Sequence, residues 1–120
     1  AYMGHYMANS NRLKDGDMVL MDYAPDYRYY TSDVTRNWPV NGKYTKDQRE
    51  LSEFILAYRD ALLERIRPGV TADQVMDGAR DKMAPLVGKL AVSKEIYREA
   101  ARGMLAFSGH LSHPVGMTVH

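Results

Sequence analysis

Carboxylate and imidazole side chains are concentrated at two places in this chain. Asp22 and Asp33 stand eleven residues apart, and the segment from Gly109 to His120 holds three of the four histidines. Carboxylate oxygen and neutral imidazole nitrogen are ligands that divalent transition metals take in proteins. The residue types therefore indicate a metal centre to which both places contribute.

The two aspartates are expected to face each other. A hairpin turn centred near Tyr27 and Arg28 places them directly opposite, with Cβ atoms about 5 Å apart. Two carboxylates at so short a distance repel each other unless a proton or cation lies between them. Together they could bind a pair of metal ions about 3.5–4 Å apart. A single aspartate has commoner roles, such as capping a turn or pairing with Arg28 or Arg36. Asp22, Asp33 and the histidines together favour the metal site.

Two strands are predicted to carry the aspartates. Residues Asp17 to Tyr23 form an apolar run of strand length after the turn signal Lys14-Asp15-Gly16, which predicts a mostly buried strand. Residues Arg28 to Arg36 are rich in tyrosine, threonine and valine and predict a second strand, antiparallel to the first.

Helices are predicted after the hairpin because two capping boxes occur, one formed by Thr45 and Gln48 and the other by Thr71 and Gln74. Apolar residues then recur at helical spacing. In the first helix these are Leu51, Phe54, Ile55, Tyr58, Leu62 and Ile66, and in the second Val75, Ala79 and Met83.

Proline, glycine and serine residues mark the predicted boundaries of the helices. Pro68-Gly69 ends the first helix, Pro85 and Gly88 end the second, and Ser93 caps a third that runs to about Ala101. Residues 103–120 read as loop and strand. The fold class is therefore α+β with an antiparallel sheet.

Composition limits the protein class. The chain has 120 residues, 45% of them apolar, a formal charge of +1 and no cysteine. These values fit one modest domain, exclude disulfides and thiolate metal sites, and give no field that would gather nucleic acid or an anionic membrane. No apolar stretch approaches the roughly 20 residues of a membrane span, and the first residues lack the features of a signal peptide, so we expect these residues to be soluble. The lack of cysteine fits cytosolic and exported proteins equally, and a cytoplasmic location is our expectation.

The aspartate segments resemble the signature of Xaa-Pro aminopeptidases and prolidases, in the creatinase and methionine aminopeptidase superfamily. The resemblance covers Met21-Asp22-Tyr23 and the run from Tyr30 to Thr45, with the same eleven-residue step between the aspartates. A histidine, His5, lies seventeen residues before Asp22, as in the family. The tail resembles the family's His-x-x-Ser-His segment and ends in Val-His.

The resemblance implies the roles of six residues. Asp22 would chelate one metal, Asp33 would bridge both metals, and His113 would bind the other. His5 and His120 would act as catalytic residues on the substrate, and His110 would line the pocket for the residue after the scissile bond. The implied cofactor is a pair of divalent metal ions, manganese first and cobalt or zinc as alternatives.

The resemblance also implies a fold and a boundary. The family's pita-bread fold is a curved antiparallel sheet with helices on its outer face, of which residues 1–120 would be the N-terminal portion in a catalytic domain. The family pattern places two glutamate ligands after the last histidine, whereas the last acidic residue here is Glu99. We therefore expect a fold incomplete at the C-terminus, negligible activity of these residues alone, and an open sheet edge that favours a homodimer.

The expected reaction is hydrolysis of the peptide bond before a proline at the second position of a peptide. A non-catalytic peptide-binding relative with the same fold is the main alternative, which the retained Asp22, Asp33 and His113 disfavour. Creatinase, which needs no metal, is disfavoured by the same residues. The run from Thr35 to Val40 and the ending Val119-His120 favour the proline-specific branch over methionine aminopeptidase, and aminopeptidase and dipeptidase stay unresolved.

Overall fold

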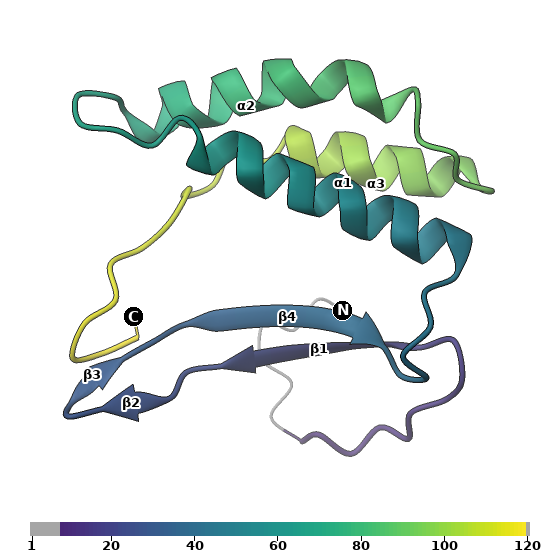
Figure 1. Ribbon diagram of the computed structural model, residues 1–120, viewed down its shortest axis with the longest axis horizontal. Coiled ribbons are helices and arrows are strands. Elements are labelled where there is room, and N and C mark those ends of the chain that lie inside the picture. The colour runs from purple at the N-terminus through teal and green to yellow at the C-terminus, as the bar shows by residue number, and fades with distance from the viewer. Residues whose placement is uncertain (1–7, 120) are drawn as a thin grey trace.

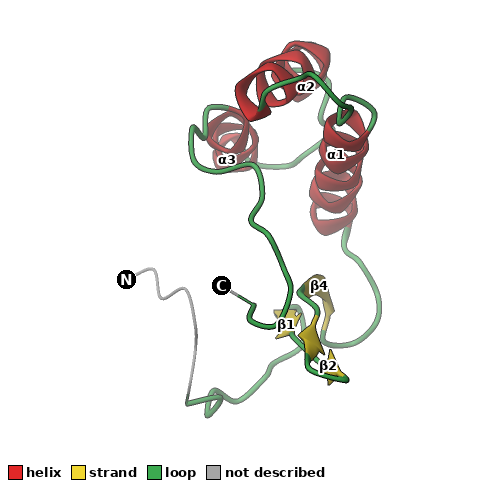
Figure 2. Cartoon of the chain, turned by 90° about the vertical axis from the view of Figure 1, so that its left-hand side faces the viewer, coloured by secondary structure: helices red, strands yellow, loops and turns green. Residues whose placement is uncertain are grey.

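The described part of the chain consists of a β-hairpin and a layer of three helices (Figure 1). The computed structural model describes residues 8–119. The strands are β1 (Met18–Tyr23), β2 (Asp26–Tyr27), β3 (Tyr30–Thr31) and β4 (Val34–Pro39), and the helices are α1 (Lys46–Leu63), α2 (Ala72–Val87) and α3 (Glu95–Leu105). In a view turned by 90°, the helices still lie together on one side of the hairpin (Figure 2). The α+β class with antiparallel strands is confirmed.

The hairpin keeps a single antiparallel register from end to end. Strand β1 pairs with β4, with Met18 opposite Pro39, and β2 pairs with β3, with Tyr27 opposite Tyr30. The two ladders are interrupted where Pro25 lies, because proline has no N–H to donate. The predicted turn centre at Tyr27 and Arg28 is therefore wrong, since the two turn residues are Arg28 and Tyr29.

The turn has an unusual sequence for its conformation. Arg28 and Tyr29 have φ angles of 51° and 70°. Positive φ at both central residues is the mark of the type I′ turn, whose twist matches that of antiparallel strands. Asparagine and glycine are the usual residues there, because a Cβ atom makes the left-handed region costly. Because neither asparagine nor glycine stands at these positions, the turn could not be located from residue types.

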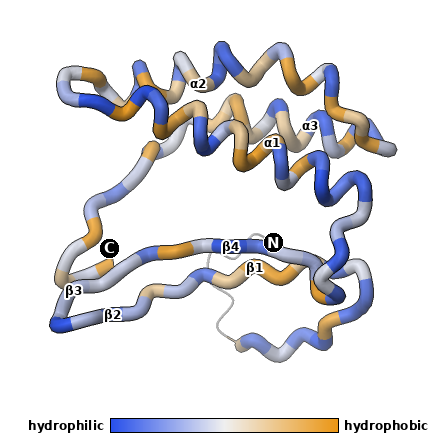
Figure 3. The backbone as a smooth tube through the Cα atoms, viewed as in Figure 1, coloured by the Kyte–Doolittle hydropathy of each residue, from blue (hydrophilic) through white to orange (hydrophobic). Residues whose placement is uncertain are grey.

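The prediction that the first strand is mostly buried is wrong. Leu20 in β1 is 66% exposed and Tyr23 is 58% exposed. The cause is the distance between the hairpin and the helices. Within residues 8–119, no Cα atom of a strand lies within 8 Å of a Cα atom of a helix. The apolar side chains of Met18, Leu20, Met21 and Tyr23 are therefore exposed. Figure 3 shows hydrophobic residues along β1, apart from the helix layer.

Both predicted capping boxes are present. Thr45 and Gln48 bond to each other's backbone N–H groups at the start of α1, and Thr71 and Gln74 do the same at the start of α2. Of the two residues predicted to end the second helix, Gly88 is confirmed as the C-cap, whereas Pro85 does not end it, because α2 continues through Pro85 to Val87. Proline so near the end removes only one helical hydrogen bond in the last turn.

Ser93 does not cap the third helix. The residue before α3 is Lys94, which makes no capping bond with its side chain. The Ser93 N–H donates to Asp47 Oδ1 over 2.8 Å and its hydroxyl donates to Asp47 Oδ2, and these two bonds hold the pKa of Asp47 below its usual value. Ser93 therefore joins the start of α1 to the entry of α3.

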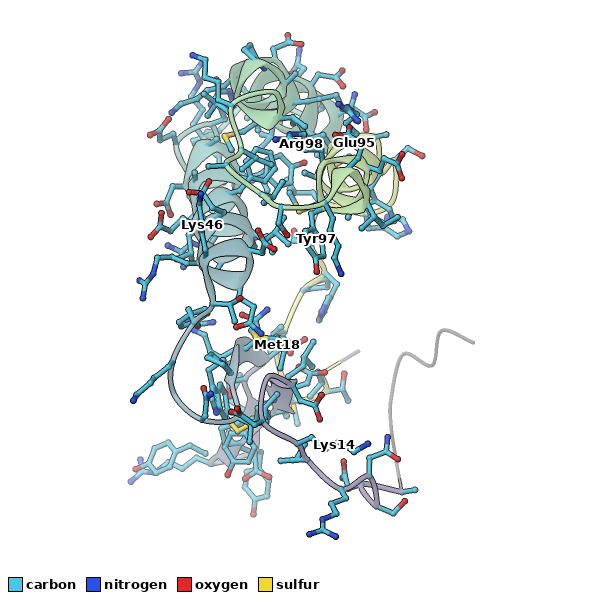
Figure 4. All side chains as sticks on the ribbon, turned by 90° about the vertical axis from the view of Figure 1, so that its right-hand side faces the viewer. Lys14, Met18, Lys46, Glu95, Tyr97 and Arg98 are labelled. Atoms are coloured by element: carbon cyan, nitrogen blue, oxygen red, sulfur yellow. The ribbon has the colours of Figure 1, made fainter. Side chains whose placement is uncertain are left out.

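The core lies within the helix layer. Its buried residues are Phe54, Ala61, Ala79, Met83, Val87, Leu90, Val92, Ala101 and Leu105. Charged residues of α3 lie at the rim of this layer, where Arg98 and Glu95 form an ion pair of 3.0 Å (Figure 4). The helices can therefore form a folded unit whose packing does not depend on the hairpin.

The tail beyond α3 was predicted to contain loop and strand. Residues 106–119 form turns and loop with no strand, so the strand part of that prediction is wrong. A search of residues 8–119 also finds no helix long and apolar enough to cross a membrane.

Replacing Tyr29 by glycine is expected to stabilise the hairpin. Tyr29 is 84% exposed, so little packing is lost, and relief of the left-handed conformation gives up to about 1 kcal/mol. Urea unfolding followed by fluorescence of Trp38, the single tryptophan, measures the change. Tyr30→Gly is the control, because glycine inside a strand should lower the midpoint. A lower midpoint for Tyr29→Gly would contradict the turn described here.

Candidate metal centre

Asp22 projects from β1 toward a threonine on the opposite strand. Thr35 of β4 is its partner in the register, and Thr35 Oγ1 donates to Asp22 Oδ1 over 2.6 Å. The prediction that Asp33 lies directly opposite Asp22 is therefore wrong, because the true turn moves the register by two residues on β4. One carboxylate oxygen of Asp22 is held by a hydroxyl, and the carboxylate as a whole is exposed.

Asp33 lies just before β4, beside the interruption in the hairpin. The strand alternation from Thr35 back to Asp33 puts it on the same face as Asp22, in the diagonal position. Diagonal neighbours in an antiparallel pair lie about 7 Å apart, which still lets two carboxylates approach a common metal pair. The Asp33 side chain is 23% exposed, so it is more enclosed than a typical surface aspartate.

The tail is tied back to the hairpin next to Asp33. Both the N–H and the hydroxyl of Thr31 donate to the carbonyl oxygen of Gly116, over 2.7 Å and 3.0 Å. These bonds join residues 85 positions apart in the sequence. The tail therefore lies along the edge of β3, and His113, three residues before Gly116, comes to Asp33.

His113 connects the tail to Asp33 by a side-chain contact. Its Nε2 lies 3.0 Å from Asp33 Oδ2, and its Nδ1 lies 3.1 Å from the carbonyl oxygen of Pro114. A carbonyl oxygen and an ionised carboxylate both only accept hydrogen bonds, so each ring nitrogen of His113 faces an acceptor, Nδ1 the Pro114 carbonyl and Nε2 the Asp33 carboxylate. A histidine metal ligand commonly has its second ring nitrogen fixed in this way.

The donor atoms fit a divalent metal ion. Two ligand atoms about 2.1 Å from one metal at a right angle lie about 3.0 Å apart. The observed separation of His113 Nε2 and Asp33 Oδ2 is 3.0 Å. Within residues 8–119, however, no group of three histidine, aspartate or glutamate side chains is close enough to hold a metal. Asp33 and His113 are therefore in contact, whereas Asp22, on the same face of the hairpin, is hydrogen-bonded to Thr35.

Of the other three predicted site residues, the structure describes only His110. His5 and His120 lie outside the described residues. His110 is exposed in the tail, three residues before His113, whereas the His-x-x-Ser-His pattern has a step of four, at which Gly109 stands here. A pocket role for His110 therefore stays a prediction without support from that spacing.

Among residues 8–119, neither Asp22 nor Asp33 forms an ion pair with Arg28 or Arg36, which was the ordinary alternative. The Arg36 guanidinium donates to the Thr35 carbonyl, and Arg28 lies over the ring of Tyr27. The polar partners of the two carboxylates are instead Thr35 and His113. Sequence reasoning missed Thr31 and Thr35, and the correct turn position would have identified Thr35 as the partner of Asp22.

Comparison with known proteins identifies a family to which this chain is similar. The model of metallopeptidase family M24 matches residues 1–120. Xaa-Pro aminopeptidase 3 of Rattus norvegicus is 37% identical over 119 residues, which are 97% of this chain and 23% of that protein. Xaa-Pro aminopeptidase of Escherichia coli K12 is 35% identical over 120 residues, 97% of this chain and 27% of that protein.

A solved structure shows the same fold. Proline aminopeptidase P II from Yersinia pestis matches with a TM-score of 0.74 and 36% identity, over 98% of this chain and 28% of that one. The prediction of part of a pita-bread fold is therefore confirmed. The chain spans about a quarter of the length of the relatives that it matches.

Removing the Thr31 hydroxyl should loosen the tail that positions His113. Thr31→Val keeps the N–H bond to Gly116 and loses the hydroxyl bond, which is worth about 0.5–1.5 kcal/mol. Amide hydrogen exchange in residues 113–118 should then rise up to about tenfold, whereas Thr31→Ser should leave it near the wild-type rate. Unchanged exchange in the valine variant would mean that the hydroxyl does not hold the tail.

Proposed function

Because this chain belongs to metallopeptidase family M24, we propose that residues 1–120 are the N-terminal portion of the catalytic domain of a metal-dependent Xaa-Pro aminopeptidase. The proposed reaction is hydrolysis of the peptide bond before a proline at the second position. The observation that supports it best is the 3.0 Å contact between His113 Nε2 and Asp33 Oδ2, because two predicted ligands 80 residues apart converge. The names of the relatives support the substrate class.

The proposed cofactor is a pair of divalent metal ions. Asp22, Asp33 and His113 would hold them, with Asp33 as the shared ligand. Two carboxylates and one imidazole form a largely oxygen donor set, which suits manganese first and also accepts cobalt or zinc. When bound, such metals activate water as a nucleophile and polarise the scissile carbonyl group.

The side chains of this chain have separate tasks in that proposal. Pro114 orients His113 by accepting from Nδ1–H, so that Nε2 faces the metal position. The tie between Thr31 and Gly116 holds the tail beside Asp33. His5 and His120 are proposed to contact the substrate, and His110 to line the pocket for the residue after the scissile bond.

The proposed partners are a peptide substrate and a second copy of the chain. Exposed apolar side chains on β1, such as Leu20 and Tyr23, favour a homodimer. The formal charge of +1 offers no field for nucleic acid or a membrane. A cytoplasmic location stays a prediction from the sequence.

A non-catalytic peptide-binding role is the second candidate function. It is favoured by one observation, that no three-residue metal cluster forms among residues 8–119. The two functions differ in whether the chain binds a divalent metal through its aspartates, and that difference can be measured.

Titration calorimetry of Mn²⁺ into the metal-free chain is expected to show saturable binding. The Asp22→Ala, Asp33→Ala double variant should lower the affinity by more than about 100-fold, since loss of a ligand exceeds the usual effect of an outer-shell residue. Asp60→Ala with Asp81→Ala removes the same charge from exposed positions on α1 and α2 and should leave the affinity unchanged.

The same samples should turn over a proline-containing dipeptide or tripeptide negligibly, because these 120 residues have no acidic residue after Glu99. Turnover that Asp33→Ala abolishes would contradict the expected inactivity. Absence of saturable Mn²⁺ binding, or equal binding by the double variant, would overturn the metal site and favour the peptide-binding role.

A further inference from the structure

Thr35 has a contact that the predicted metal ligands do not account for. It stands directly opposite Asp22 in the register of β1 and β4. Its hydroxyl lies 2.6 Å from Asp22 Oδ1, and the hydroxyl is the donor because an ionised carboxylate only accepts. A hydrogen bond to a charged acceptor is about twice as strong as a neutral one.

The threonine is itself well fixed. A β-branched side chain on a strand has a restricted χ1 angle, so the position of its hydroxyl follows from the backbone. The Thr35 carbonyl oxygen, within β4, accepts a hydrogen bond of 2.8 Å from the guanidinium group of Arg36. By contrast, Asp22 is an exposed side chain that without a partner would sample several rotamers.

We propose that Thr35 is the positioning residue for Asp22 in the metal centre. The hydroxyl holds Oδ1 and so fixes the orientation in which the carboxylate meets a divalent metal ion. This inference rests on the proposed function, and it assigns to Thr35 a role equivalent to that of the Pro114 carbonyl toward His113. Asp22 then has Oδ1 held by Thr35, and His113 has Nδ1 beside the Pro114 carbonyl while its Nε2 faces Asp33.

A merely structural role is the competing explanation. A β-branched side chain can also stabilise a sheet by packing against its cross-strand neighbours, and such a role would depend on the shape of the side chain. Valine has nearly the same shape as threonine without the hydroxyl, and serine keeps the hydroxyl without the methyl group. Thr35→Val and Thr35→Ser therefore separate the hydrogen bond from the packing.

The test uses two measurements on the wild-type chain and both variants. In the metal-free state, NMR three-bond couplings report whether the Asp22 χ1 angle is single or averaged. Calorimetric titration with Mn²⁺ then gives the affinity, and thermal unfolding checks that each variant is folded. Asp22→Ala identifies the binding that passes through this site.

The expected result is that Thr35→Val averages the Asp22 rotamers and weakens Mn²⁺ binding by about 10- to 100-fold, the usual effect of an outer-shell partner. Thr35→Ser should keep a single rotamer and most of the affinity. Full affinity in Thr35→Val, or equal loss in both variants, would overturn the role of the hydroxyl while the metal site stands. Absence of any Mn²⁺ binding that Asp22→Ala removes would overturn the proposed metal site, and the role of Thr35 with it.

Discussion

The register of one β-hairpin determines where the two candidate aspartate ligands of this protein lie. Because Arg28 and Tyr29 form the turn, Asp22 faces Thr35, and Asp33 falls at the interruption beside Pro25. A change of one residue in the register would turn one strand's side chains to the other face of the sheet. The pair of turn residues with positive φ is therefore the constraint on which the geometry of the site depends, although it lies at the exposed tip of the hairpin.

The second part of the site depends on a long-range tie. Gly116 accepts two hydrogen bonds from Thr31 at the edge of β3, and these bonds hold the tail where His113 meets Asp33. The helices contribute less directly. Their core is complete within their own layer and packs against no strand in the described part of the chain. The helices connect the hairpin to the tail in the sequence, and the hydrogen bonds between Thr31 and Gly116 position the tail beside the hairpin.

Local chemistry was predictable from the sequence, and long-range pairing was not. The boxes of Thr45 with Gln48 and Thr71 with Gln74 were found because each involves residues three apart. Ser93 was misassigned because its partner, Asp47, lies 46 residues away. The register was misplaced because Arg28 and Tyr29 are not the glycine or asparagine that mark such a turn. The residue types of Asp33 and His113 did predict that they belong together, but Thr31, which helps to bring them together, had no signal of its own.

The central claim is that Asp22, Asp33 and His113 form one site. Paramagnetic broadening of backbone NMR signals by a small fraction of an equivalent of Mn²⁺ tests it most directly, because broadening falls steeply with distance from the ion and identifies residues individually. We predict that the amides of residues 22, 33 and 113 broaden together while those of α2 and α3 stay sharp. Broadening centred instead on helix carboxylates such as Glu95, or spread evenly over the chain, would contradict the claim.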